Sequence, residues 1–207
     1  MTPFYRLVRW VIRWAAGILF RVEWHGVEKL PSQGAYLCVA NHASYLDPPL
    51  VACGMPRECH TLAKAELFDV PILGWLIRHL HAHPVRRGGV DRAALRQCVD
   101  ILRQGNILLL FPEGTRSRDG ELQPPKNGAA MIATMADVPI VPTYVEGTFE
   151  AWPIGRRLPR LKKIRVFYGE PFLPPRTTVG ERPDYDALSQ DIISRIASLK
   201  AEAAAHK

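Results

Sequence analysis

The sequence predicts an α/β domain with a mostly parallel central sheet covered by helices. Residues 35–40 and 107–111 are apolar throughout, which is typical of strands that are buried on both faces of a parallel sheet. Segments with helical spacing of apolar residues separate and follow these strands, and such alternation is typical of an α/β fold. The length of 207 residues suits one domain. We expect this domain over residues 24–207, after an N-terminal helix within residues 1–23.

Residues 1–80 hold three expected helices around the first strand. Residues 4–20 show apolar residues at helical spacing. Asp47 followed by Pro48 is typical of a helix start, with Asp47 as the N-cap and Pro48 at the first helical position. Pro71 opens a further apolar stretch that ends at Leu80, and Pro is favoured where a helix begins.

The rest of the chain continues the alternation of strands and helices. Asp91 and Gly105 bracket a helix as its N-cap and its C-terminal stop, and the apolar strand 107–111 follows directly. Apolar spacing predicts the remaining elements, which are helices over residues 129–136 and 186–200 and strands over residues 140–145 and 164–168. The Ala-rich tail over residues 201–207 is expected to fray.

The composition is that of an ordinary globular protein, with 47% apolar and 23% charged residues. This excludes disordered, collagen-like and disulfide-rich classes. The net charge of +7 indicates an anionic partner, which is nucleic acid, a membrane surface or a phosphorylated substrate. The chain contains no recognisable nucleic-acid-binding module, so nucleic acid is not expected. No run of about 18 apolar residues is present, so a membrane-spanning helix is not expected either.

Cysteine and histidine side chains are common metal ligands, so we considered whether they form a metal site. The four cysteines form no C-x-x-C pair and are expected to be reduced thiols; they are Cys38, Cys53, Cys59 and Cys98. A site on Cys53, Cys59 and His60 would fit no usual ligand spacing. The triplet of His79, His81 and His83 alternates and would share one strand face, but no carboxylate or cysteine completes a site there. We therefore expect no metal.

A basic amphipathic helix is expected at the N-terminus. At about 100° per residue, the arginines of residues 4–20 gather on one side of the helix; they are Arg6, Arg9 and Arg13. The opposite side is apolar and comprises Leu7, Val11, Trp14, Ala15 and Ile18, with Trp10 at its flank. Such a helix is typical of proteins that lie on a membrane surface. The alternative is a helix packed on its own domain with its arginines in water.

The residues after the first buried strand predict a general base. Ligands of open α/β sheets bind beyond the carboxyl ends of the strands, and His42 and Asp47 follow residue 40. Five residues apart, they meet only if the chain turns between them. The carboxylate then holds one ring nitrogen of His42 and leaves the other free to take a proton. This arrangement suits a reaction in which a hydroxyl of the substrate is the nucleophile. The alternative is a capping Asp beside a loop His.

The residues after the second buried strand predict an anion site. Gly114 permits close approach of the backbone, and the planar guanidinium of Arg116 matches phosphate oxygens. Thr115 and Ser117 add hydroxyl donors. The alternative is a polar turn with solvated charges.

Together these residues resemble the signature of a known family. Asn41-His42-x4-Asp47 and Phe111-Pro112-Glu113-Gly114-Thr115-Arg116-Ser117 are similar to motifs of the glycerolipid acyltransferases, whose best-known members are the 1-acyl-sn-glycerol-3-phosphate (lysophosphatidic acid) acyltransferases. Further blocks resemble the family in order and spacing; they are Lys64 through Gly74 to Arg87, Lys126 with Gly128, and Val138 to Pro142. The resemblance covers roughly residues 24–175.

The resemblance implies an enzyme that transfers a fatty acyl group without an acyl-enzyme. His42 would be the general base, oriented by Asp47, and the acceptor hydroxyl would attack the thioester of acyl-CoA or acyl carrier protein. Ser44 is read as a loop residue. No cofactor is implied, and the acceptor would be 1-acyl-sn-glycerol-3-phosphate. Other acceptors (glycerol-3-phosphate, a lyso-ornithine lipid or another lysolipid) and a non-catalytic lipid-binding relative stay open.

The resemblance also assigns the residues that bind the acceptor phosphate. The block from Glu113 through Gly114 and Thr115 to Arg116 would bind it, with Arg116 as the main cation. Arg87 and Lys64 would close the pocket, and Glu113 would position Arg116 or a hydroxyl. A protein with this activity and this N-terminal helix is expected to be peripheral or monotopic on the cytoplasmic face of a membrane. The basic segment 156–163 would meet anionic lipid or form a solvated loop.

Overall fold

The structure is built on one seven-stranded sheet. The computed structural model describes residues 1–85, 91–176 and 181–205. The strands are β1 (Glu23–His25), β2 (Tyr36–Ala40), β3 (Cys59–Lys64), β4 (Ala82–Val85), β5 (Ile107–Leu110), β6 (Ile140–Glu146) and β7 (Arg165–Tyr168). Their order in the sheet is β1-β7-β6-β2-β5-β3-β4. All neighbours pair in parallel except β6 and β7, so the predicted mostly parallel α/β fold is confirmed.

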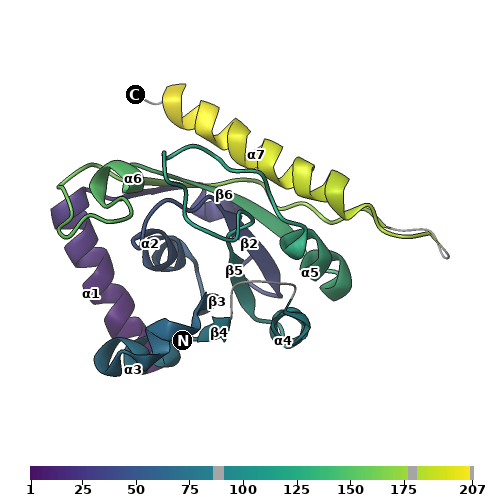
Figure 1. Ribbon diagram of the computed structural model, residues 1–207, viewed down its shortest axis with the longest axis horizontal. Helices are drawn as coiled ribbons and strands as arrows, with labels where there is room; N and C mark the ends of the chain where they lie inside the picture. Colours follow the sequence, from purple (N-terminus) through teal and green to yellow (C-terminus); the bar gives the residue numbers. More distant parts are fainter. Residues whose placement is uncertain (86–90, 177–180, 206–207) are drawn as a thin grey trace.

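Helices cover both faces of this sheet (Figure 1). The helices are α1 (Pro3–Phe20), α2 (Asp47–Gly54), α3 (Pro71–His79), α4 (Arg92–Arg103), α5 (Gly128–Ala136), α6 (Thr148–Ala151) and α7 (Tyr185–Ala205), with short 3-10 turns at Val27–Lys29 and Ala65–Asp69. One core lies between the sheet and α4, α5 and α7, and a second lies between the sheet and α1 and α2. Strands β2 and β5 are buried at every position because they separate these two cores.

The carboxyl ends of four parallel strands meet at one edge of the sheet. Strands β2, β5, β6 and β3 run in the same direction, so the segments that follow Ala40, Leu110, Glu146 and Lys64 all leave the sheet at this edge. Because parallel strands bring such segments together, residues that are far apart in the chain can build one site there.

Some helix ends differ from the sequence prediction. Asp91 is the N-cap of α4 as predicted, and its side chain accepts the N–H groups of Ala93 and Ala94 at 3.0 Å. Asp47 is not the N-cap of α2, because the cap is Leu46 and no side chain bonds the end of the helix. The C-terminal helix extends to Ala205 where fraying was expected after residue 200.

The predicted strand carrying three alternating histidines is wrong. His79 is the last residue of α3, His81 lies between the elements with a φ of 59°, and only His83 is part of β4. The structure instead places the ring of His60 of β3 against the rings of both His81 and His83, with centroid distances of 4.7 and 5.2 Å. Within the described ranges, no group of three or more His, Cys, Asp or Glu residues is arranged to hold a metal ion.

Two arginines of α1 bond to the domain, and the predicted apolar side of this helix points outward. Arg9 Nε and Arg13 Nη1 donate to the carbonyl oxygen of Cys53 at 3.0 and 2.8 Å, where the last turn of α2 attracts cations. Trp10 and Trp14 are 64% and 61% exposed. The helix does pack on its own domain, as the alternative held, but it does so through residues outside the predicted apolar side; these buried residues are Tyr5, Ala16 and Phe20. Among the described residues, no helix has the length and hydropathy that crossing a membrane requires.

Candidate active site

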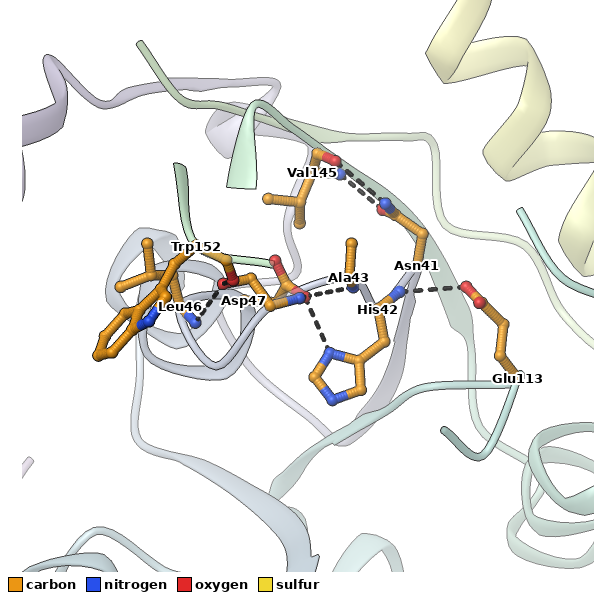
Figure 2. Close-up of polar contacts among 9 residues, drawn as sticks. Asn41, His42, Ala43, Leu46, Asp47, Glu113, Val145 and Trp152 are labelled. Atoms are coloured by element: carbon orange, nitrogen blue, oxygen red, sulfur yellow. Dashed lines mark hydrogen bonds and ion pairs between the residues drawn. The ribbon is translucent and has the colours of Figure 1, made fainter. Parts of the chain in front are cut away.

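The His42–Asp47 pair lies directly beyond β2, in what we call the His42 loop (residues 41–46). His42 Nδ1 lies 2.8 Å from Asp47 Oδ2, and the Asp47 side chain is fully buried. The same carboxylate oxygen accepts the backbone N–H groups of Ala43 and Ser44 at 2.7 Å each. Figure 2 shows the bonds from His42 and Ala43 to Asp47. The turn that brings the two side chains together is thus closed around the carboxylate itself, which is why Asp47 does not cap α2.

The imidazole of His42 is held on one side and open on the other. Its ring stacks on Phe111 with centroids 4.0 Å apart, and its side chain is 11% exposed. Nε2 points away from Asp47 (Figure 2) and has no hydrogen-bond partner among the described residues. An imidazole with Nδ1 bound to a carboxylate and Nε2 free is arranged to accept a proton from a substrate.

The segment after β5, which we call the Glu113 loop (residues 111–117), forms two hydrogen bonds with the backbone of His42. The His42 N–H donates to Glu113 Oε1 at 3.1 Å, and the Ser117 N–H donates to the His42 carbonyl oxygen at 2.7 Å. Two hydrogen bonds therefore join the two motifs, which the sequence places about 70 residues apart.

Glu113 is an interior residue with a perturbed carboxyl group. It is 3% exposed, and burial raises its pKa to about 7 against the opposing effect of the backbone amides of His42 and Gln123. Its carboxylate bonds the His42 amide, whereas the sequence led us to expect it to position Arg116 or a hydroxyl. The structure thus places Glu113 behind the histidine and away from solvent.

Two residues that sequence reasoning did not assign to the site anchor the His42 loop to β6 and α6. Asn41 donates from Nδ2 to the Val145 carbonyl at 3.0 Å and accepts the Val145 N–H at 2.7 Å. Ser44 Oγ donates to the carbonyl oxygen of Trp152 at 2.8 Å. Because this hydroxyl is buried and bonded to a carbonyl, Ser44 is placed as a loop residue. The position of Asn41, between a buried strand and the motif histidine, is the one sequence signal that pointed to its role.

Arg116 lies at the rim of the site with part of its hydrogen-bonding capacity unused. Its Cζ lies 3.6 Å from the centroid of the Tyr45 ring, and its buried Nη1 has no hydrogen-bond partner among the described residues. Thr115 beside it is exposed. Gly114 adopts a φ of +70°, and a Cβ built there would lie 3.1 Å from Lys126 Nζ. Two cationic side chains therefore flank the exposed tip of the Glu113 loop.

Of the other two residues predicted to bind the phosphate, the structure describes only Lys64. Lys64 ends β3 at the same edge of the sheet, is exposed, and pairs with Glu66 at 3.0 Å. Arg87 lies outside the described residues. The four cysteines are buried and unpaired.

Comparison with known proteins shows which family has a similar sequence. The model of the acyltransferase family matches residues 21–146. The chain is 34% identical over 142 residues to a chloroplastic 1-acyl-sn-glycerol-3-phosphate acyltransferase of Brassica napus, covering 66% of this chain and 40% of that protein. It is 30% identical over 151 residues to the 1-acyl-sn-glycerol-3-phosphate acyltransferase of Bacillus subtilis, covering 72% of this chain and 73% of that protein.

A solved structure is similar over nearly the whole chain. It is the crystal structure of the 1-acyl-sn-glycerophosphate (LPA) acyltransferase PlsC from Thermotoga maritima, with a TM-score of 0.78 and 30% sequence identity over 95% of this chain and 80% of that chain. The His42–Asp47 pair and the Glu113 loop both fall within the segment that the family model covers. This chain belongs to the acyltransferase family.

Proposed function

We propose that this protein transfers a fatty acyl group from a thioester donor, acyl-CoA or acyl carrier protein, to the free hydroxyl of 1-acyl-sn-glycerol-3-phosphate. The product is phosphatidic acid, a precursor of phospholipids. The observation that carries the proposal is the 2.8 Å contact between His42 Nδ1 and Asp47 Oδ2, which leaves Nε2 free to act as a base. The names of the relatives support the choice of acceptor.

The reaction needs one base and no nucleophile from the protein. His42 Nε2 accepts the proton of the acceptor hydroxyl while that oxygen forms a bond to the thioester carbonyl carbon. Asp47 stabilises the imidazolium that results. The tetrahedral intermediate then releases the thiolate, which takes the proton back from His42. The chain has no Gly-x-Ser-x-Gly nucleophile motif, and the Ser44 hydroxyl is bonded elsewhere.

Arg116 supplies the charge for the acceptor phosphate. A guanidinium at the rim of the site with a free N–H can form strong charge-assisted hydrogen bonds to phosphate oxygens. Thr115 is exposed beside it, and the Lys126 side chain lies over Gly114. Arg87 and Lys64 complete the set of residues that we assign to this subsite on the family resemblance. No step requires a metal or a cofactor.

We propose that the outward side of α1 lies on a membrane, at its cytoplasmic face. The exposed apolar side chains of α1 are Leu7, Trp10, Val11, Trp14, Ile18 and Leu19. The segment after α6 lies near the C-terminal end of α1, because the Ile164 N–H donates to the Phe20 carbonyl at 3.1 Å. This segment exposes Leu158 and Leu161 among basic residues, which suits an anionic lipid surface.

The test is an acyl-transfer assay that crosses donors with acceptors. Purified protein is given acyl-CoA or acyl carrier protein together with 1-acyl-sn-glycerol-3-phosphate, glycerol-3-phosphate or a lyso-ornithine lipid, and H42A is assayed in parallel. We expect transfer to the first acceptor and a loss of about 10²- to 10⁴-fold in H42A. Full activity in folded H42A would overturn the mechanism. Transfer only to a different acceptor would overturn the assignment of the substrate, and thioester cleavage without any acceptor would indicate a hydrolase.

A further inference from the structure

Tyr45 and Arg116 form a stacked pair that joins the His42 loop to the Glu113 loop. Arg116 Cζ lies 3.6 Å from the centroid of the Tyr45 ring. Tyr45 is 54% exposed, whereas the core tyrosines Tyr36 and Tyr168 are 0% and 1% exposed. The ring of Tyr45 therefore lies at the surface of the site, and Arg116 covers part of it.

The Tyr45 ring is supported from a second direction. Trp152 meets it edge-on, with ring centroids 6.5 Å apart and planes at 66°. Trp152 is itself anchored, because its carbonyl accepts the Ser44 hydroxyl and its Nε1 donates to the Arg156 carbonyl, both at 2.8 Å. The Tyr45 ring, over which Arg116 lies, is thus also supported by Trp152, a residue outside the two motifs.

The stacking fixes the plane of the guanidinium without using its donors. All five N–H groups of an arginine lie in the guanidinium plane, so a ring packed against the face leaves the edge free to bind. Nη1 is buried and has no hydrogen-bond partner in the described part of the chain. A buried donor without a partner is costly when the pair serves stability alone, and a phosphate oxygen would satisfy it.

We propose that Tyr45 is a positioning residue that sets the affinity of the site for a phosphate-bearing acceptor by orienting the guanidinium of Arg116. The inference rests on the proposed function, which supplies the phosphorylated acceptor. Tyr45 does not take part in proton transfer, so its contribution is to binding and not to the chemical step.

The test compares Y45L, which removes the ring, with Y45F, which keeps it. For 1-acyl-sn-glycerol-3-phosphate, Y45L should raise KM about 3- to 10-fold, with kcat within about twofold of the wild type. Y45F should restore the wild-type KM. For 1-acylglycerol, which lacks the phosphate, the KM values of all three proteins should agree. A matched control is F172L, since Arg195 lies 4.0 Å over the Phe172 ring on α7's side of the molecule. That variant should leave KM for both acceptors unchanged.

A double-variant cycle shows whether the effect passes through Arg116. Lysine keeps the charge but has no planar group to stack, so Y45L should have no additional effect on KM in the R116K background. An equal rise in KM in both backgrounds would overturn the proposal. Equal KM values for the wild type and folded Y45L would also overturn it, and so would a rise in KM of the same size for 1-acylglycerol.

Equilibrium binding of glycerol 3-phosphate separates this inference from the proposed function. Weaker binding by Y45L than by Y45F in a protein that transfers no acyl group would refute the proposed reaction and uphold the role of Tyr45. Equal binding by the two variants in a protein that transfers acyl groups would refute the role of Tyr45 alone. Thermal unfolding of each variant confirms that it is folded, and if Y45L unfolds, Y45M replaces it in every arm.

Discussion

The carboxylate of Glu113 accepts the backbone N–H of His42 at 3.1 Å, so the loop that follows β5 holds the histidine of the loop that follows β2. Glu113 thus bonds the main chain of His42, the proposed base, while Asp47 and Phe111 contact the His42 ring. A buried acidic residue of the second motif therefore helps to position the histidine of the first motif.

Replacement of Glu113 by Gln should change the pH dependence of stability. Burial raises the pKa of the folded carboxyl from 4.5 to about 7. Between these pH values the folded state holds more protons than the unfolded state, so the free energy of unfolding falls as pH rises. E113Q keeps an acceptor for the His42 N–H and cannot ionise. Its stability relative to the wild type should therefore be higher at about pH 8 than at about pH 5, by about 1–3 kcal/mol.

Urea unfolding of both proteins at the two pH values measures this difference. E121Q is a suitable control, because Glu121 is an exposed residue of the same region and its replacement should shift stability little at either pH. A stability difference between E113Q and the wild type that is independent of pH would contradict a carboxyl with a raised pKa.

Replacement of Gly114 by Ala should weaken acceptor binding. The residue has a φ of +70°, and an added Cβ would lie 3.1 Å from Lys126 Cδ and Nζ. The backbone strain costs about 1 kcal/mol of stability, and the contact displaces the Lys126 side chain, which we assign to the same phosphate subsite as Arg116. We expect a several-fold rise in the KM for 1-acyl-sn-glycerol-3-phosphate, on the order of 3- to 10-fold.

Gly34 supplies the matched control for that change. It has a φ of +75°, and a Cβ built on it has no atom within 4 Å. G34A should therefore show a similar loss of stability in thermal unfolding and a wild-type KM. If G34A raised KM as much as G114A does, the effect would come from lost stability and not from the Lys126 contact.

His60 should make the protein less stable in acid. Burial, and then the neighbouring rings of His81 and His83, lowers its pKa from 6.5 to about 4. His60 Nδ1 lies 2.9 Å from His83 Nε2, which leaves no room for both nitrogens to carry protons. Between pH 6.5 and pH 4 the unfolded state holds more protons, so stability decreases as pH falls through this window. Because the stack is partly exposed, we expect a loss of about 1–2 kcal/mol between about pH 7 and about pH 5.

H60Q should reduce that loss, since glutamine does not titrate. Unfolding by urea at several pH values between these limits, in the wild type, H60Q and H25Q, measures the effect. His25 is also stacked on an aromatic ring, Phe167, and so controls for the loss of a stacked imidazole. An unchanged pH profile in H60Q would show that other groups cause the acid sensitivity.

The sequence predicted the pairing of His42 with Asp47, but it did not predict the contacts that hold this pair in place. Two residues five apart could meet only across a turn, and His42 and Asp47 do so. The contacts that fix this turn were not predictable, because they join backbone atoms of distant segments. Asn41 bonds Val145 across 104 residues, and Ser44 bonds Trp152 across 108 residues. No local pattern encodes such pairs, since they depend on which strands become neighbours.

Dependence on distant contacts also explains why the sequence did not predict three of the strands, or which side of α1 faces the domain. β1 and β4 are short edge strands, and β3 mixes polar and apolar residues, so none shows the continuous apolar run of β2. For α1, the helical wheel separates arginines from apolar residues but does not say which side meets the domain. That choice depends on the Cys53 carbonyl at the end of α2, which accepts bonds from Arg9 and Arg13.

The outward side of α1 should govern membrane binding. Trp10 and Trp14 are 64% and 61% exposed, so the double variant W10S/W14S loses few contacts within the protein and should keep the wild-type melting temperature. It should bind vesicles of phosphatidylglycerol and phosphatidylcholine at least about tenfold more weakly, because a membrane would bury both indoles. Vesicle flotation measures the bound fraction. L173S is the matched control, because Leu173 is 60% exposed but follows Phe172, which pairs with Ile140 at the end of β6 opposite the site. Equal binding by W10S/W14S and the wild type would show that α1 does not lie on the membrane.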